Sequence, residues 1–469
     1  MTRINTNVSS LTAQQNLARS NSQLQTALTR LSTGLRINSG QDDPAGLIAA
    51  AQLGNEIGST NAAISNTKSA ENMINTADGA LSQITTLLND IRSLITQTAN
   101  NAVLSSDQIA ANQTQIESSL QAINRISQTT TYQNKNLLDG SLGYDYTYTT
   151  PGNVTNLTIQ QAIKSGMSTD DPMSVSVAIT TAAAQATVDE TAAFGSSKLK
   201  DDVVFQLVGS KGSVVFTLKK DTAVTDVEAE INAVQDATGV TSDATGNLSS
   251  VGYGSDAIVN VNIYSQGALG GLTTASATGD DIVATVNGTA AQGKGNTFSV
   301  NTAQLAMSAT VADGDDTAFA FDITGGGALF QLGSNINTNN QASLGIQSVD
   351  TGSLGGVDGL LYELTSGGDA DLATNITKAA NIVDEALNQI TSLRGRLGTF
   401  QKSTLETNIN ALSDTVTALT NAQSTIQDAD FAAETANLTR AQILVQSGTA
   451  VLQVANKQPK DVLALLQNL

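Results

Sequence analysis

The chain has 469 residues, with no cysteine, histidine or tryptophan, and its 42 acidic and 22 basic side chains give a formal net charge of −20. Without histidine or cysteine, the chain cannot form a Ser-His-Asp or Cys-His catalytic group, a histidine-ligated zinc site or an HExxH protease motif. Its acidic balance also argues against nucleic acid or an anionic membrane as a partner, so we expect neither nucleic-acid binding nor membrane insertion.

Residues 1–44 predict an amphipathic helix that ends in a turn. The apolar side chains recur mostly at steps of three, four or seven residues, at Ile4, Val8, Leu11, Leu17, Leu24, Leu28, Leu31 and Leu35. This spacing is typical of one helix face. Gly40 can end the helix, Asp43 can cap the next one, and Pro44 fits its first position, where a missing N–H costs nothing.

Residues 45–140 predict two further helices and a short hairpin. The first helix begins with Leu53, Ile57 and Ile64 and continues in a 3-4-3-4 register through Ile74, Ala77, Leu81, Ile84, Leu88, Ile91 and Ile95. The second runs through Ile109, Ile116, Leu120, Ile123 and Ile126. No aromatic residue precedes Tyr132, so these helices must bury aliphatic seams of the coiled-coil type. The stretch "TTTYQNKNLLDGS" then indicates a turn and short hairpin.

Residues 141–327 predict one or two small α+β modules. "DVVFQLVGSKGSVVFTLK" reads as two strands and a turn, "DAIVNVNIYS" alternates as a half-buried strand does, and "TDVEAEINAVQDA" offers a short amphipathic helix. The segment "DGDDTAFAFD" lacks a full calcium-loop register, "GKGNTF" lacks the glycine spacing of a phosphate loop, and paired acids such as Asp201 and Asp202 fit solvated loops. We therefore predict no catalytic residue, cofactor or metal.

Residues 328–469 predict strands that lead back into helices. One seam contains Ile376, Ala380, Val383, Leu387 and Ile390, and another contains Leu405, Ile409, Leu412, Val416 and Leu419. The closing segment keeps a 3-4-3-4 seam through Leu438, Ala441, Val445, Gly448, Leu452, Ala455, Pro459, Val462, Leu466 and Leu469. A stripe of this kind must be covered by another apolar surface.

The helices near the two ends can cover each other's stripes, which predicts an elongated α+β fold. Long terminal helices pack together in a coiled-coil-like way, and the β-rich insert lies at the far end. The inner helices can close a bundle within one chain. The outer segments, residues 1–44 and 426–469, are thin and leave apolar surface exposed, so we expect them to be frayed in the monomer and to fold on association. Periodicity leaves open whether that association is a closed dimer or an open array.

Two long motifs at opposite ends of the chain resemble bacterial flagellin. They are "INTNVSSLTAQQNL" followed by "LSTGLRINSGQDDPAGLIAA", and "IQDADFAAETANLTRAQILVQSGTAVLQVANKQPKDVLALL". The resemblance covers roughly residues 1–140 and 340–469, and "DTAVTDVEAEINAVQDATGVTS" is similar to a small motif of flagellin outer domains. It implies an inner-tube domain D0 from 1–44 and 426–469, a domain D1 from 45–140 and 328–425, and surface-exposed outer domains D2/D3 from 141–327.

The resemblance implies a secreted, non-enzymatic subunit that polymerises head to tail into the hollow helical filament used for swimming. Its partners would be copies of itself, the type III export apparatus with an export chaperone, and the hook-associated and cap proteins. The implied inner-tube interface comprises Ile4, Val8, Leu11, Leu17, Leu24, Leu28, Leu31, Leu438, Val445, Leu452, Val462 and Leu466. We expect the tail stripe to pack against Ile4, Val8, Leu11 and Leu24 of the same chain and against neighbouring arms. The implied chaperone site comprises Leu438, Ile443, Leu444, Leu452, Leu463 and Leu466.

The segment that flagellins present to the vertebrate Toll-like receptor departs from the family pattern. The positions implied by the resemblance are Leu88, Asp90, Arg92, Leu94 and Gln115. Arg92 and Leu94 match, but Asp90 stands where the family has a basic residue and Gln115 where it has a glutamate. An anion facing a site that expects a cation weakens binding, so we expect weak receptor activation.

Two other classes of protein share parts of this pattern. A hook–filament junction protein has the same terminal pattern, although the unbroken "DDPAG" and "KQPKDVLALL" blocks favour the filament subunit. A secreted coiled-coil adhesin or translocator would normally carry a Sec signal or a membrane-inserting segment. The first twenty residues lack the apolar region of such a signal, and no apolar run reaches the ~18 residues of a membrane span.

Overall fold

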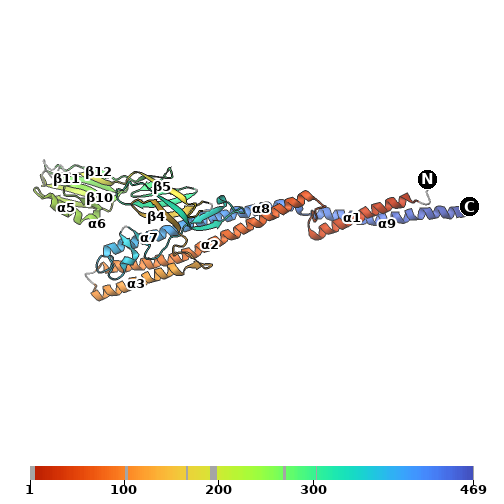
Figure 1. Ribbon diagram of the computed structural model, residues 1–469, viewed down its shortest axis with the longest axis horizontal. Coiled ribbons are helices and arrows are strands. Elements are labelled where there is room, and N and C mark those ends of the chain that lie inside the picture. Colours follow the sequence, from red (N-terminus) through yellow and green to blue (C-terminus); the bar gives the residue numbers. More distant parts are fainter. Residues whose placement is uncertain are drawn as a thin grey trace. The chain divides into compact units, whose positions relative to one another are not determined.

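The computed structural model describes residues 6–100, 104–164, 167–190, 198–267, 271–302, 304–356 and 358–467, and it describes only the backbone of 458–467. Long helices form both ends of the chain and strands its middle, which confirms the predicted fold class (Figure 1). The chain divides into two compact units. The arm unit contains residues Met1–Lys68, Leu332–Asn335 and Leu405–Leu469, and the bundle unit contains Ser69–Gln331 and Ile336–Thr404.

The arm unit is built from helix pairs of the two chain ends. Helix α1 (Val8–Thr33) lies beside α9 (Phe431–Gln467), as Figure 1 shows, and the two run antiparallel because Asn7 contacts Ala455 whereas Arg30 contacts Glu434. The first turns of α2 (Pro44–Thr98) belong to the same unit as α8 (Thr407–Gln427). Helix α8 buries no residue fully, as expected for a two-helix contact. Four residues of the predicted seam, Ile409, Leu412, Val416 and Leu419, are half-buried in it, whereas the fifth, Leu405, precedes the helix and is buried.

The turns that follow α1 and α8 are hydrogen-bonded to each other. Helix α1 ends at Thr33 because Gly34 adopts a left-handed conformation with φ of 74°, so the prediction that Gly40 ends this helix was wrong. The amide of Arg36 donates to the carbonyl of Gln427 at 2.7 Å, and the amide of Ala429 donates to the carbonyl of Gly34 at 2.9 Å. These bonds satisfy backbone groups that the helix ends leave free.

The start of α2 follows the predicted capping pattern. Pro44 is its first residue, and the Asp43 carboxylate accepts a hydrogen bond from the Gly46 amide at 2.9 Å. Gly46 leaves no room for a side chain, because a Cβ there would lie 2.5 Å from Asp43 Oδ2 and 2.6 Å from Ile37 Cδ1. Ile37 is buried beneath this cap.

The long helices of the bundle unit are α2 from Ser69 onward, α3 (Ser106–Thr129) and α7 (Ile376–Thr399). The predicted seam of α2 from Ile74 to Ile95 is fully buried. Its partner α7 buries Ala379, Ile382, Val383, Ala386, Ile390, Leu393 and Leu397. Two of these match the predicted α7 seam, but Ala380 and Leu387 lie beside it and are half-buried. The face turned inward is wider than a single 3-4 stripe because α7 packs against more than one neighbour.

A hairpin and several short elements connect the bundle to the strands. Strands β1 (Thr131–Tyr132) and β2 (Lys135–Asn136) form the predicted hairpin, whose turn residues Gln133 and Asn134 have positive φ. The other short elements are β19 (Ala328–Gln331), β20 (Gln341–Leu344), β21 (Gly355–Gly356), β22 (Gly359–Leu360), the 3₁₀ turns Thr338–Asn340 and Leu361–Leu364, and a π-helical turn at Phe400–Glu406.

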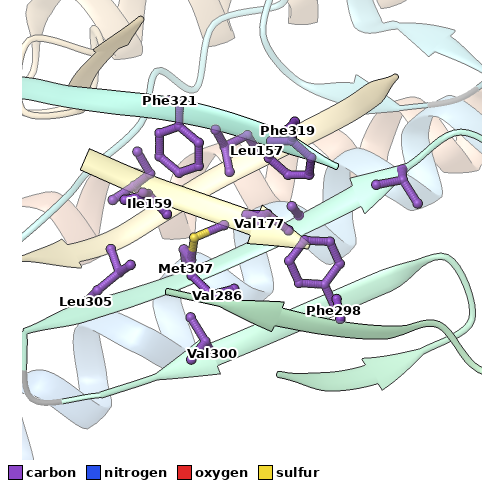
Figure 2. Packing of buried hydrophobic residues seen from close by; sticks show 14 of the residues in the cluster. Leu157, Ile159, Val177, Val286, Phe298, Val300, Leu305, Met307, Phe319 and Phe321 are labelled. Carbon is purple, nitrogen blue, oxygen red and sulfur yellow. The ribbon is translucent and has the colours of Figure 1, made fainter. Parts of the chain in front are cut away.

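The first β module contains a five-stranded and a four-stranded antiparallel sheet. The five strands, in spatial order, are β14 (Thr289–Ala290), β13 (Val283–Val286), β5 (Met173–Thr181), β18 (Phe319–Gly326) and β3 (Tyr144–Thr150). The four are β15 (Gln292–Lys294), β16 (Thr297–Asn301), β17 (Leu305–Val311) and β4 (Val154–Ala162). Figure 2 shows side chains of both sheets, among them Phe298, Met307 and Phe321, gathered in one core.

The second β module has a separate core and one covering helix. Its sheets have the orders β6 (Gln185–Asp189), β10 (Asn247–Tyr253), β9 (Val240–Ser242), and β12 (Ala275–Thr278), β11 (Ile258–Gln266), β7 (Val203–Gly209), β8 (Ser213–Leu218). Phe205 and Phe216 stack at 5.3 Å in its core. The predicted amphipathic helix is α5 (Val224–Ala233), continued by α6 (Gln235–Thr238). The strand pair β7–β8 and strand β11 were also correctly predicted.

Candidate functional site

The carboxylates of the middle region stabilise loops. Asp281 accepts hydrogen bonds from the Gly295 and Ser255 amides, and these bonds hold the pKa of its carboxyl below the usual range. Asp202 has a lowered pKa for the same kind of reason, because it accepts from the Lys220 amide and the Lys219 ammonium. Such bonds favour the ionised form and rigidify turns.

Among the described residues, no three His, Cys, Asp or Glu side chains lie close enough together to hold a metal ion. Within "DGDDTAFAFD", Asp315 accepts from the amide and hydroxyl of Thr317, which is a local turn. No described helix is long and apolar enough to cross a membrane.

Helices α1 and α9 meet along a seam in which small residues alternate with leucines. On α9 the buried and half-buried positions follow a strict heptad, through Glu434, Leu438, Ala441, Val445, Gly448, Leu452 and Ala455. On α1 they are Asn7, Ser10, Ala13, Leu17, Ser20, Leu24, Ala27, Arg30 and Leu31. A Cβ on Gly448 would lie 3.7 Å from Leu17 Cβ, so the two backbones approach closely at this point. The predicted seam of α9 is confirmed from Leu438 to Ala455; the side chains of Pro459, Val462 and Leu466 are not described, and Leu469 lies outside the described residues.

Eight large apolar side chains among the described residues of the two arm helices lie outside the seam, and we call this set the outer arm face. It comprises Val8, Leu11 and Leu28 of α1 and Phe431, Ile443, Leu444, Val451 and Val454 of α9, all exposed. Within one chain the tail stripe therefore does not pack against Val8 and Leu11, contrary to that part of the expectation. The close approach of the helices admits Ser10 and Ala13, and it turns the larger neighbours outward. An exposed apolar set of this kind on a helix pair marks an interaction surface.

Polar groups lie at both ends of the seam. Near the chain ends, the Asn7 amide donates to the Ala455 carbonyl at 2.8 Å and the Ser10 hydroxyl donates to Asn456 Oδ1 at 2.7 Å. At the other end Arg30 Nη1 lies 3.9 Å from a carboxylate oxygen of the buried Glu434. Of these residues only Ala455 was predicted from the sequence, because the other five are polar and do not belong to the apolar periodicity. The signal in the sequence for the α1 side of this contact is the run of small and polar residues spaced three apart, Asn7, Ser10 and Ala13.

The predicted interface and chaperone residues divide between the seam and the outer arm face. Leu17, Leu24, Leu31, Leu438, Val445 and Leu452 are half-buried in the seam, whereas Val8, Leu11, Leu28, Ile443 and Leu444 are exposed. Ile4 lies outside the described residues. Val462, Leu463 and Leu466 lie in α9, where only the backbone is described.

The predicted receptor segment is partly buried. Leu88 and Leu94 lie in the bundle core, so these two side chains are not accessible from outside. Both residues fall on the inward side of α2, next to the heptad of Ile84, Ile91 and Ile95. Asp90, Arg92 and Gln115 are exposed, and Arg92 pairs with Asp384 of α7 at 2.9 Å.

Comparison with known proteins matches the arms and the full length of the chain. The model of the bacterial flagellin N-terminal helical region matches residues 4–142, and that of the C-terminal helical region matches 380–466. The B-type flagellin of Pseudomonas aeruginosa and the flagellin of Salmonella typhimurium are each 30 % identical to this chain, with 99 % of both chains covered in each case. The structure of FliC from Burkholderia pseudomallei aligns over 71 % of this chain and 99 % of its own length, at 15 % identity and a TM-score of 0.27, a likeness too weak to carry an argument.

Proposed function

The chain belongs to the bacterial flagellin family and is a structural subunit of the flagellar filament, and on this premise we propose that its two arms carry the surface through which copies polymerise head to tail. The observation that carries this proposal is the outer arm face. Its apolar side chains lie on a helix pair whose own seam is thin, so the pair cannot cover them. In a helical array each copy covers this surface of the next, and a head-to-tail contact that does not close continues indefinitely.

We place the arms, residues 1–44 and 426–469, in the inner tube as domain D0. Domain D1, comprising residues 45–140 and 328–425, would form the next shell, and residues 141–327 would face solvent as the outer domains D2/D3. Support comes from the distribution of charge, since no arginine occurs between Arg125 and Arg394 and this stretch holds most of the acids. An acidic surface repels its own copies and suits exposure to water.

We further propose that the chain is exported to the extracellular filament through the flagellar type III apparatus, and that an export chaperone covers α9 beforehand. Ile443 and Leu444 are exposed even when α1 is paired, and Leu438 and Leu452 become available when α1 is absent. The hook-associated and cap proteins would be the neighbours at the two ends of the filament. Recognition of an amphipathic helix in an apolar groove uses such side chains, at steps of three, four and seven residues.

A Toll-like receptor of the host would recognise this chain weakly. The exposed part of the segment presents Asp90 in place of a cation, and Arg92 is engaged by Asp384. A dose response of receptor-expressing cells equal to that of a strongly sensed flagellin would contradict this proposal.

The test of the arm proposal is seeded polymerisation of purified protein, followed by electron microscopy and sedimentation. Val451 and Val454 of the outer arm face are 57 % and 62 % exposed. Burying each contributes about 1 kcal/mol or more, so Val451→Ser with Val454→Ser should raise the critical concentration about thirtyfold. Removing residues 440–469 should abolish growth.

The matched control replaces two equally exposed valines of the β modules. Val215 and Val283 are each 52 % exposed. Val215→Ser with Val283→Ser should leave the critical concentration unchanged. Normal growth of the Val451/Val454 variant, or of the truncated chain, would refute the assignment of the arms as the polymerisation surface.

A further inference from the structure

Helix α9 contains a proline in its interior, and this leaves one backbone carbonyl without its helical partner. In an α-helix the carbonyl of residue i accepts from the N–H of residue i+4. Pro459 lies within α9 and has no N–H, so the carbonyl of Ala455 cannot accept that bond. Ala455 is buried against α1, and an unpaired carbonyl there would cost free energy.

The side chain of Asn7 supplies the missing donor from the other arm. Its Nδ2 donates to the Ala455 carbonyl at 2.8 Å, while its Oδ1 accepts from the Ser10 amide at 3.0 Å and so caps α1. Both ends of the carboxamide are therefore used. The buried Ser10 extends the contact by donating through Oγ to Asn456 Oδ1 at 2.7 Å.

The apolar seam does not select a single alignment of the two helices. Ala441, Gly448 and Ala455 repeat at intervals of seven, so a slip of α1 by one heptad would again place small residues along the contact. Single polar contacts are known to fix register in such helix pairs. The Arg30–Glu434 pair at the other end is longer, at 3.9 Å.

We propose that Asn7 and Pro459 together fix the register of the arms, because the Asn7 carboxamide can donate only to the carbonyl that the proline leaves without a helical partner. After a slip of seven residues Asn7 would face Gly448, whose carbonyl can accept from the Leu452 amide within α9. The donor would then lose its partner and the Ala455 carbonyl would remain unpaired. This inference rests on the proposed function, because the outer arm faces of neighbouring copies match only if every copy has the same register.

The chain has no cysteine, so engineered disulfides can report the register in the full-length monomer. Leu17→Cys with Gly448→Cys reports the described alignment, because the two Cβ atoms would lie 3.7 Å apart, within the usual range for a disulfide. Leu17→Cys with Ala441→Cys reports a slip of one heptad. The measured quantity is the ratio of the two rates of intramolecular disulfide formation under the same oxidant.

Asn7→Asp is the informative substitution, because aspartate caps a helix as well as asparagine does but cannot donate to the carbonyl. It should lower the native-to-slipped ratio about tenfold, as expected for one lost bond and one unpaired carbonyl. Pro459→Ala should lower the ratio as well, by giving the carbonyl an ordinary helical donor. In that background Asn7→Asp should have little further effect. Asn16→Asp, an exposed change of the same type on α1, should leave the ratio unchanged.

An unchanged ratio in Asn7→Asp would overturn the proposal, and so would full additivity of the Asn7 and Pro459 changes. The assay needs no filament, so its outcome is independent of the polymerisation test with Val451 and Val454. Failure of that test with a clear register effect would refute the proposed interface and leave the Asn7–Pro459 pairing standing. The reverse result would leave the interface standing and refute the pairing.

Discussion

Replacing Gly46 with alanine should destabilise the start of α2, although alanine is the better helix former. The new Cβ would lie 2.5 Å from Asp43 Oδ2 and 2.6 Å from Ile37 Cδ1. Displacing the Asp43 carboxylate removes a helix cap worth about 1 kcal/mol. Moving the buried Ile37 costs about 1–3 kcal/mol. The gain in helix propensity is at most about 1 kcal/mol, so the net loss is about 2 kcal/mol.

Hydrogen exchange followed by mass spectrometry can measure this loss, because it reports local opening of α2 in the intact chain. A loss of about 2 kcal/mol corresponds to roughly thirtyfold faster exchange of the amides that follow Asp43. The matched control is Gly58→Ala in the same helix, where a Cβ meets nothing within 4 Å. It should slow exchange severalfold, through the same gain in helix propensity. Wild-type or slower exchange in Gly46→Ala would refute the steric reasoning.

Three further predictions concern charged groups. Arg394→Met removes two hydrogen bonds to Asp78, of 2.8 and 3.4 Å. Because both side chains are partly exposed, the free energy of unfolding measured by thermal denaturation should fall by only about 0.5–1 kcal/mol, and a loss above about 2 kcal/mol would contradict this. Burial raises the pKa of Glu190, so the folded state binds its proton more tightly and gains stability as pH falls towards the usual value of 4.5. Glu190→Gln should therefore reduce the pH dependence of the melting temperature between pH 7 and 4.5. An unchanged dependence on pH would refute this cause. Hydrogen bonds, above all from the Thr245 hydroxyl, lower the pKa of Asp243 to about 2. Its contribution to folding stability is therefore present above pH 3.8 and is lost as pH falls through 2. Asp243→Ala should destabilise the protein by about 1 kcal/mol at pH 7 and by nothing near pH 1.5, and an equal effect at both pH values would exclude ionisation as the cause.

Periodicity predicted the buried face of a helix well wherever that helix packs along a single apolar stripe. The α2 seam and the heptad of α9 could be assigned because large aliphatic residues, or an unbroken 3-4 spacing, point to a single buried face. At the start of α1 the same reasoning failed, although it correctly placed Leu17, Leu24 and Leu31 in the seam. The seam there consists of Asn7, Ser10 and Ala13, and an analysis that follows apolar side chains assigned their larger neighbours instead. Which residues fill a seam depends on how closely two backbones approach, and this distance is set by the partner, here by Gly448.

The receptor segment shows a second limit. Its residues came from a family pattern, whereas the heptad of the same helix already indicated that Leu88 faces inward. The two kinds of inference were in conflict within the sequence itself, and burial agrees with the periodicity. The Asn7–Ala455 bond could not be predicted, because it joins residues 448 positions apart and depends on the alignment of two helices.

The strands through which the chain enters and leaves the first β module are neighbours in one sheet. Tyr144 at the start of β3 pairs with Gly326 at the end of β18. The whole polypeptide between these residues is therefore closed by a two-stranded stem, and replacing it with a shorter or longer piece changes the entropy of closure only slowly with length. Exchange of this segment, by recombination or by grafting of foreign epitopes, needs a replacement whose own ends lie one strand spacing apart, and it gives up the hydrogen bonds from residues 343–347 to Leu157, Gln160 and Ala162. The helices at either end of the chain could keep their sequences when the segment between Tyr144 and Gly326 is replaced.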